Sequence, residues 1–387
     1  MSINKICIVT GSRSDYAYLK PIIEKIERST KLEMFLVVTG IHLLEEHGNT
    51  FETIIKDGFH ITKIIQMYDP KEKSKLRFGK SVGKAIINFT DCFNEIKPDI
   101  VLVLGDRYEP LAAVIAASTL SIGIAHIHGG DNVSKGQIDE QIRHAITKFA
   151  HIHFPATLKS SKRIILMGEE PWRVKMFGSP TMDEICEPEK LSKEELFKEL
   201  QLNPTERTVL CVQHPYIVKS NKAGEQMAMT LQILKDLNIQ SIIIYPNNDL
   251  GSSLIIKIIE SYRNTPKFKL YKNLDRVLYL SLLKNANLLI GNSSSGLIET
   301  PFFKLPVINL GDRNKGRETG ANVLHATFEA SEFLSALRKG LSKEFKDFCQ
   351  NVKNPYGEGK TGEKIVQILE ELKIDKKLLI KRLTYKV

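Results

Sequence analysis

The stretch IVLVLGDRYEP, residues 100–110, joins five apolar residues to a glycine, a charged turn and a proline. The apolar run shows no alternation of polar and apolar positions, which is typical of a parallel β-strand covered on both faces. Pro110 suits the first turn of a helix, where its missing N–H group is not needed. The stretch therefore predicts a buried strand that passes directly into a helix, with Asp106 and Arg107 at the turn.

Further apolar runs rich in β-branched residues recur along the chain, separated by segments with helical spacing. They cover residues 6–10, 35–39, 122–127, 152–154, 174–177, 209–212, 242–245, 288–290 and 307–310. This alternation predicts α/β layers joined by right-handed crossovers. One charged and polar segment, residues 182–208, interrupts the alternation between two blocks of similar size. We therefore place a domain boundary near residue 180.

The net charge of +10 is concentrated near the end of the chain, because the last fifteen residues hold six cations against one anion. No basic run is interleaved with aromatic residues, so the charge does not indicate nucleic-acid binding. A modest positive field would still help to capture an anionic small molecule. Hydrophobic residues make up 42% and charged residues 26% of the chain, which is an ordinary globular balance with enough apolar residues for a sizeable core.

Five scattered cysteines without a CxxC pair indicate reduced thiols in a cytosolic protein. No signal peptide is visible, and no apolar stretch approaches the ~20 residues that cross a bilayer. We expect a cytoplasmic protein with no membrane partner.

The polar residues that follow each apolar run are expected to form the site, because ligands of open parallel sheets bind beyond the carboxyl ends of the strands. Two such edges facing each other across a cleft would enclose an extended ligand such as a nucleotide-sugar. The segments are residues 11–16, 40–42, 105–109, 126–131, 214–215, 246–249, 291–296 and 311–320.

Two of these segments in the first half place an arginine beside a strand end. Arg13 in GSRSDY offers a fork of donors to phosphate or uracil at the start of a helix, although a plain capped turn would use the same residues. Asp106 beside Arg107 is either a structural ion pair or a site acid or base with a controlled pKa.

The segment HIHGGD, residues 126–131, leads into a helix that bears Asp139 and Arg143 on one face. On a strand, His126 and His128 would project from the same side. Zinc ligation by these histidines is the alternative to an acid/base role. Zinc sites, however, need three or four protein ligands, and no cysteine lies nearby. The histidines that we expect only to pack are His151 and His153.

In the second half, Pro215 of QHP turns the chain and leaves His214 at the sheet edge, where an imidazole can donate to phosphate or transfer a proton. The segment GNSSSGLIE, residues 291–299, favours a backbone cradle for phosphate. Glu299 can accept both ribose hydroxyls, although a capping cluster without a ligand is the alternative. The glycine-rich loop that follows carries two arginines suited to an anionic ligand, Arg313 and Arg317.

These motifs, in this order, resemble the hydrolysing UDP-N-acetylglucosamine 2-epimerases, which include bacterial enzymes of sialic and legionaminic acid synthesis. The similarity runs from Arg13 to about Gly320 and includes GDR, IDEQIRHAITK, QHP, GNSSSG, INLG and GRETG. It implies the α/β glycosyltransferase-B architecture of two Rossmann-like domains with the active site between them. The implied domains are residues 1–180 on the sugar side and 181–364 on the UDP side, with a C-terminal helix of about 365–387 returning to the first.

The resemblance also implies a reaction in two steps. A base removes the proton on carbon two of UDP-N-acetylglucosamine while UDP departs from carbon one, giving a 2-acetamidoglucal. Water then adds, and the products are N-acetylmannosamine and UDP. No metal and no other cofactor is implied. The expected partners are the UDP-sugar, UDP and further copies of the chain in a homodimer or homotetramer.

Together with the strand-end pattern, the resemblance gives two sets of candidate site residues. The catalytic set is Asp106, His128, Asp131, Asp139, Arg143 and His214. The set expected to contact UDP or the substrate is Arg13, Arg107, His214, Asn247, Ser293, Ser294, Glu299, Arg313 and Arg317.

One position departs from much of the family, since many members have glutamate where this chain has His128. The role of that glutamate passes either to His128 or to Asp131. The departure leaves the substrate open between UDP-N-acetylglucosamine and UDP-N,N'-diacetylbacillosamine or a related nucleotide-sugar. Other activities of the same fold are a non-hydrolysing epimerase, a retaining glycosyltransferase and a nucleotide-sugar sensor. The acids around His128 disfavour the last two.

Overall fold

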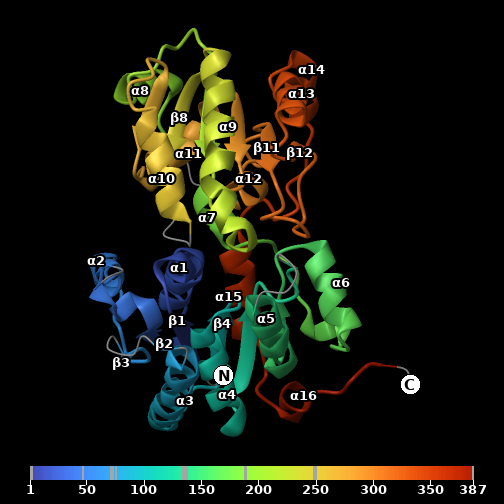
Figure 1. Ribbon diagram of the computed structural model, residues 1–387. Coiled ribbons are helices and arrows are strands. Elements are labelled where there is room, and N and C mark those ends of the chain that lie inside the picture. The colour runs from blue at the N-terminus through green and yellow to red at the C-terminus, as the bar shows by residue number, and fades with distance from the viewer. Residues whose placement is uncertain are drawn as a thin grey trace. The chain divides into compact units, whose positions relative to one another are not determined.

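The chain forms two compact units in the computed structural model (Figure 1). The structure describes residues 3–45, 48–69, 74, 76–132, 138–186, 190–246 and 251–385, with the backbone alone described at 217–219. Unit 1 comprises Met1–Cys186 and Tyr356–Val387, and unit 2 comprises Glu187–Pro355. The chain thus leaves unit 1 and returns to it near its end. The predicted roles of the two domains, a sugar side and a UDP side, stay predictions.

Unit 1 contains a parallel sheet in the order β3-β2-β1-β4-β5-β6. This order is that of a doubly wound nucleotide-binding fold. The strands are β1 (Asn4–Thr10), β2 (Leu32–Thr39), β3 (Lys63–Ile65), β4 (Ile100–Leu104), β5 (Gly123–Ile127) and β6 (Ile152–Phe154).

Successive residues of the strands in unit 1 pack into two separate apolar clusters. Ile6 and Ile8 belong to a cluster with helices α1 and α15, whereas Cys7 and Val9 belong to a cluster with α3, α4 and α5. Both faces of the sheet are therefore buried, which explains why the strands show no period-two alternation. The helices of unit 1 are α1 (Arg13–Glu27), η1 (Gly40–Leu43), α2 (Phe51–Lys56), α3 (Arg77–Ile96), α4 (Tyr108–Thr119), α5 (Ile138–Phe149), α6 (Leu158–Leu166), η3 (Pro171–Arg173), α7 (Thr181–Ile185), α15 (Thr361–Glu371) and α16 (Lys376–Leu379).

Unit 2 repeats the same topology with the strand order β12-β11-β10-β7-β8-β9, again all parallel. The strands are β7 (Thr208–Val212), β8 (Gln240–Ile244), β9 (Phe268–Tyr271), β10 (Leu288–Gly291), β11 (Val307–Leu310) and β12 (Val323–Ala326). The helices are α8 (Lys193–Glu199), η4 (Ile217–Lys222), α9 (Ala223–Asp236), α10 (Ser252–Ser261), α11 (Arg276–Asn285), α12 (Ser295–Ile298), α13 (Ala330–Gly340) and α14 (Lys343–Cys349). Two α/β units with parallel sheets confirm the predicted fold class.

The strands that the sequence did not predict lie at sheet edges. They are β3, β9 and β12, each of three or four residues. An edge strand is covered less completely, so it needs no continuous apolar run. The predicted strand at residues 174–177 is wrong, because only Val174 forms a bridge, with His153 of β6.

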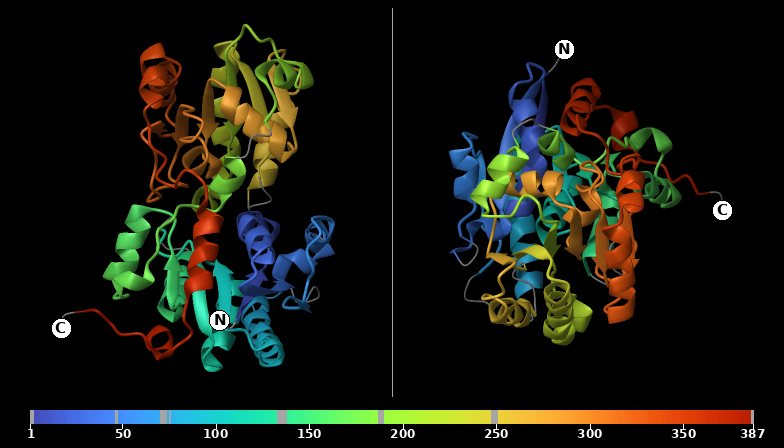
Figure 2. Two further views of the ribbon diagram at one scale, coloured as in Figure 1. Left: turned by 180° about the vertical axis from the view of Figure 1, so that it is seen from behind. Right: turned by 90° about the horizontal axis from the view of Figure 1, so that it is seen from above.

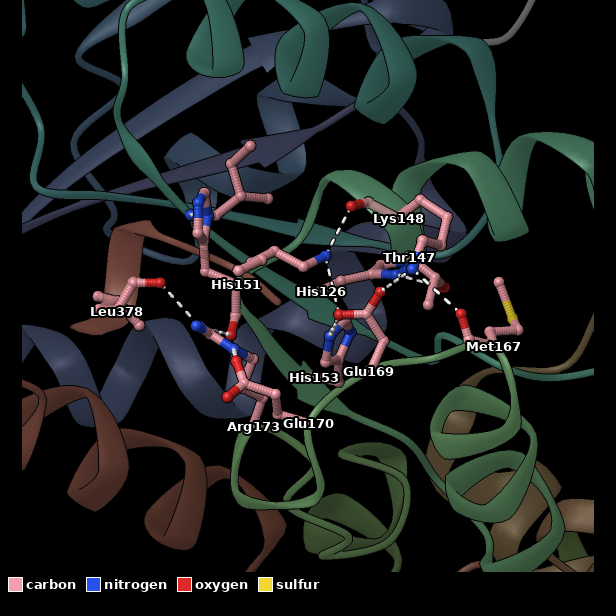
Figure 3. Close-up of polar contacts among 12 residues, drawn as sticks. His126, Thr147, Lys148, His151, His153, Met167, Glu169, Glu170, Arg173 and Leu378 are labelled. Carbon is pink, nitrogen blue, oxygen red and sulfur yellow. Dashed lines mark hydrogen bonds and ion pairs between the residues drawn. The ribbon is translucent and has the colours of Figure 1, made fainter. Parts of the chain in front are cut away.

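The end of the chain is built into unit 1. Helix α15 packs on the sheet through Ile365 and Leu369 (Figure 2), and the carboxylate of Asp183 accepts the first backbone N–H groups of this helix at 2.7 and 2.8 Å. Beyond it, the buried Arg173 donates to the carbonyl of Leu378 at 2.7 Å (Figure 3). It also donates to the carbonyl of Lys377 at 2.9 Å. Among the described residues, no helix is long and apolar enough to cross a membrane.

We predict that Arg173→Met weakens unit 1, because the exchange leaves buried carbonyls without a donor. The expected loss in the free energy of unfolding is about 3 kcal/mol. Trp172, the one tryptophan of the chain, lies 4.3 Å from the Arg173 guanidinium and reports on this unit. Urea denaturation followed by its fluorescence measures the loss. The matched control is Arg382→Met, an exposed arginine of the same tail, and equal stability of the two variants would contradict this account of the tail.

Candidate active site

Asp106 and Arg143 meet at the carboxyl edge of the sheet in unit 1. Asp106 follows β4 after a single residue, Gly105, which has a φ of 81°. Arg143 comes from α5 and forms an ion pair with the Asp106 carboxylate. The carboxylate keeps 23% of its surface exposed, whereas the Arg143 side chain keeps 7%. The arginine is therefore a buried support for an acid that solvent or a ligand can reach.

Asp139 lies in the first turn of α5, the same helix that carries Arg143. Burial raises the pKa of its carboxyl, while the positive charge of Arg107 lowers it. A carboxyl group with a raised pKa can take and return a proton closer to neutral pH than an ordinary aspartate. Asp139 and Asp106 are thus two acids with different surroundings near one strand end.

His128 stands in a left-handed turn with a φ of 60°, immediately after β5. Its Nε2 lies 3.1 Å from the Ser179 hydroxyl, and its ring meets Tyr18 edge-on at 5.1 Å. Asp131 lies 3.9 Å from the other ring nitrogen and accepts a hydrogen bond from Ser160 at 2.5 Å. A positive φ is uncommon outside glycine, and the contacts with Ser179 and Tyr18 hold the ring in place.

His126 does not share a role with His128. The prediction placed both histidines on one strand, but β5 ends at Ile127 and His128 lies in the turn beyond it. His126 is fully buried, lies 2.8 Å from the Gly105 carbonyl oxygen, and has a pKa that burial lowers to about 3. It supports the turn that carries Asp106.

His153 is packed with charged partners, as Figure 3 shows. Its Nε2 lies 3.2 Å from the buried carboxylate of Glu169, which also pairs with Lys148 at 2.6 Å and Lys381 at 2.8 Å. His151 accepts the backbone N–H of Ile124 at 3.0 Å. In the part of the chain that the structure describes, no group of three or more metal-ligating side chains gathers in one place.

Arg13 and Arg107 reach the same edge from two strands. Arg13 is exposed at the start of α1, which Ser12 caps. Arg107 occupies the N-cap position of α4 without a side-chain capping hydrogen bond. Its side chain is 40% exposed and its Nε lies 3.6 Å from the buried carboxylate of Glu109. Sequence reasoning gave Glu109 no role, although it lies within the GDRYEP motif.

In unit 2, two loops that the sequence singled out are tied together. The backbone N–H of His214 donates to the Asn292 side chain at 2.7 Å, and Asn292 returns a hydrogen bond to the His214 carbonyl at 2.9 Å. Arg313 donates to the Asn292 carbonyl at 3.0 Å. Burial lowers the pKa of His214 to about 3, with Arg313 acting in the same direction. The imidazole is therefore neutral near pH 7 and can donate one hydrogen bond.

The GNSSSGLIE loop needs glycine at its start, since a Cβ on Gly291 would lie 2.0 Å from the Val212 carbonyl oxygen. Ser293 and Ser294 follow, half-buried, before the short helix α12. Glu299 beyond this helix is held on both oxygens, by Arg276 at 2.9 Å and by the Ser295 hydroxyl at 2.5 Å.

Arg276 was missed, because a single arginine at the start of a helix carries no distinctive pattern.

Asn247 lies outside the described residues. Arg317 is half-buried in the loop after β11, seven residues beyond Leu310, where that strand ends. A cavity of about 490 Å³ opens at the ends of β10, β11 and β12, within the volume range of small-ligand sites. Its lining includes Tyr216, Asn292, Arg313 and Phe328.

Two doubly wound units with charged and hydroxyl side chains at their strand ends define an α/β protein of the nucleotide-binding class. The family model described as UDP-N-acetylglucosamine 2-epimerase matches residues 24–370. The chain belongs to this family, which confirms the resemblance.

Two relatives share about a third of their residues with the chain. The UDP-N,N'-diacetylbacillosamine 2-epimerase (hydrolyzing) of Legionella pneumophila is 35% identical, over 98% of this chain and 99% of the relative. The UDP-N-acetylglucosamine 2-epimerase of Neisseria meningitidis is 32% identical, over 87% and 88%. A solved structure of UDP-GlcNAc 2-epimerase from Neisseria meningitidis, bound to UDP-GlcNAc, matches with a TM-score of 0.81 at 17% identity, covering 95% of this chain and all of that one.

The buried histidines predict a pH-dependent stability. Burial lowers the pKa of His42 to about 4 and those of His126 and His214 to about 3. The unfolded chain therefore binds more protons than the folded one between these values and ~6.5, so stability rises with pH in that window. Asp15, whose pKa burial raises to about 6, opposes this, as does Asp139, whose pKa burial also raises.

We expect the free energy of unfolding to fall from pH 7 to pH 5, with a limiting slope of ~1.4 kcal/mol per pH unit for each such histidine. Urea denaturation at pH 7, 6 and 5, followed by circular dichroism, measures it. His126→Asn should flatten the dependence, while the exposed His60→Asn should not. Stability that is constant or greatest at pH 5 would refute the assignment.

Proposed function

We propose that this chain is a hydrolysing 2-epimerase of a UDP-2-acetamido sugar. The observation that carries the proposal is the pairing of Asp106 with Arg143 beside Asp139, at the strand edge of a chain that belongs to the 2-epimerase family. The reaction removes the proton on carbon two, breaks the bond from carbon one to UDP, and adds water across the double bond. The substrate and water give the free sugar inverted at carbon two and UDP.

Proton transfer falls to unit 1 in this proposal. Asp106, fixed by Arg143, and Asp139, with its raised pKa, are the candidate base and acid. His128, Asp131 and Arg143 complete the set. A proton on a carbon beside an acetamido group is weakly acidic, so its removal needs a departing group that is strongly stabilised.

In this proposal, cations, hydroxyl groups and the neutral His214 stabilise the departing UDP. A neutral imidazole donates a hydrogen bond to a phosphate oxygen but adds no positive charge, so the charge comes from arginines such as Arg313 and Arg107. Serine hydroxyls and Glu299 suit phosphate and ribose, respectively. The full proposed UDP set is Arg13, Arg107, His214, Asn247, Ser293, Ser294, Glu299, Arg313 and Arg317.

For the sugar, we propose UDP-N,N'-diacetylbacillosamine, with UDP-N-acetylglucosamine as the second candidate. The relatives at 35% and 37% identity, from Legionella pneumophila and Campylobacter jejuni, carry the first sugar in their names, and the Neisseria relative at 32% carries the second. We further propose that the protein works in the cytoplasm as a homo-oligomer in sialic- or legionaminic-type sugar synthesis. The similarity at 33% to the polysialic acid biosynthesis protein P7 of Escherichia coli supports this class of pathway.

We predict that the purified chain releases UDP and a free, inverted sugar from both nucleotide-sugars, with kcat/KM at least about tenfold higher for the diacetamido sugar. That ratio corresponds to ~1.4 kcal/mol in the transition state, the scale of one extra polar contact. NMR in deuterated water should show deuterium at carbon two of the free product. Deuterium in an intact UDP-sugar with no UDP release would identify a non-hydrolysing epimerase, and a higher kcat/KM for UDP-N-acetylglucosamine would reverse the order of the two candidates.

We predict that His128→Ala lowers kcat by roughly a hundredfold, the usual size of a general acid/base contribution, and leaves UDP affinity unchanged. Turnover and calorimetry with UDP measure the two quantities, with the exposed His60→Ala as the control. If Asp131→Asn is severe while His128→Ala is mild, Asp131 carries the role. Full activity in both variants would remove the HIHGGD segment from the chemistry.

A further inference from the structure

Glu109 is a fully buried carboxylate in the first turn of α4. One oxygen, Oε1, accepts a hydrogen bond from the Tyr68 hydroxyl at 3.0 Å. The other, Oε2, accepts none from any residue that the structure describes. A buried carboxylate oxygen without a donor is costly, and neither the fold nor the proposed proton transfers account for it.

Glycines at two other strand ends leave the space that this carboxylate occupies. A Cβ on Gly11, after β1, would lie 2.7 Å from the Cγ of Glu109. A Cβ on Gly40, after β2, would lie 2.5 Å from its Oε1, and Gly40 also has a φ of 66°. Glu109 is thus enclosed at the carboxyl edge of β1, β2 and β4. It cannot touch a ligand itself, because none of its surface is exposed.

Oε2 of Glu109 faces Arg107, whose Nε lies 3.6 Å away. Arg107 is 40% exposed, and no residue that the structure describes forms a hydrogen bond to its two terminal nitrogens, Nη1 and Nη2. Its neighbour Asp106 is engaged elsewhere, by Arg143. Asp106 and Arg107, the adjacent side chains of the GDR motif, therefore have separate partners. The partner of Arg107 is the buried Glu109, which lies on the Nε side of the guanidinium.

We propose that Glu109 is a positioning residue, whose buried charge holds Arg107 by Nε so that Nη1 and Nη2 meet the diphosphate of the nucleotide-sugar. This rests on the proposed function, since it takes the ligand to be a UDP-sugar. An arginine presents its two terminal nitrogens to phosphate as a fixed fork, and a fork held at its base loses less conformational freedom on binding. Asp15 and Asp139 also act electrostatically on Arg107, but neither comes within ion-pairing distance of it.

Glu109→Gln separates this role from simple packing. The glutamine keeps the shape of the side chain, and its amide oxygen can still accept from Tyr68. Its amide nitrogen then faces Nε of Arg107, so a donor meets a donor and the hold on the guanidinium is lost. A carboxylate that only stabilised the start of α4 would change folding stability and not affinity for UDP.

The test is a double-mutant cycle on the dissociation constant of UDP, measured by calorimetry with the full chain. We expect Glu109→Gln and Arg107→Ala each to weaken UDP binding about tenfold, and the double variant to bind no more weakly than Arg107→Ala alone. Independent effects that multiply to about a hundredfold would overturn the proposal, as would unchanged affinity in Glu109→Gln. Glu169→Gln, which alters an equally buried carboxylate of unit 1, should leave UDP affinity unchanged.

If Glu109→Gln does not fold, as judged by circular dichroism, Tyr68→Phe replaces it in the cycle. This variant removes the hydroxyl that fixes Oε1 and keeps the charge, so we expect UDP to bind about threefold more weakly, and only while Arg107 is present. An effect of Tyr68→Phe that persists in the Arg107→Ala background, or no effect at all, would overturn the proposal. Wild-type protein that binds no UDP would overturn the proposed function, and this inference with it.

Discussion

Burial of both faces of each parallel sheet fixes where the chemistry of this protein lies. Strands such as β1 send alternate residues into two different apolar clusters, so a shift by one residue would exchange every contact. The strands are therefore locked in register, and their carboxyl ends stay at one edge. Asp106 after β4, His128 after β5 and Arg13 after β1 reach the edge of unit 1 for this reason alone.

Charge at that edge is organised in pairs. Asp106 has Arg143, and Arg107 has Glu109, with the more buried member of each pair providing the support. Burial keeps His126 at this edge neutral, and in unit 2 it does the same for His214. An edge built in this way can present acids and donors to a polar ligand without a large excess of unpaired charge inside the fold.

The basic end of the chain also pairs with buried groups of unit 1. Lys381 lies against the buried carboxylate of Glu169, and the backbone carbonyls of the tail accept hydrogen bonds from Arg173. Glu169 in turn contacts His153, which lies beside His126 in the neighbouring strand. The tail thus packs against unit 1, where one of its cations, Lys381, pairs with a buried carboxylate.

The sequence by itself determined the α/β class, most of the strands and the segments that follow them, because continuous apolar runs and glycine turns are local patterns. It also determined the family, through motifs that lie close together in the chain. The sequence did not predict edge strands such as β12, since a partly buried strand needs no continuous run of apolar residues. Only the tertiary structure decided that Asp106 pairs with Arg143, that Glu109 lies behind Arg107, and that His126 is buried against the Gly105 carbonyl. Those contacts join residues from different elements, and their geometry follows from packing that no local pattern records.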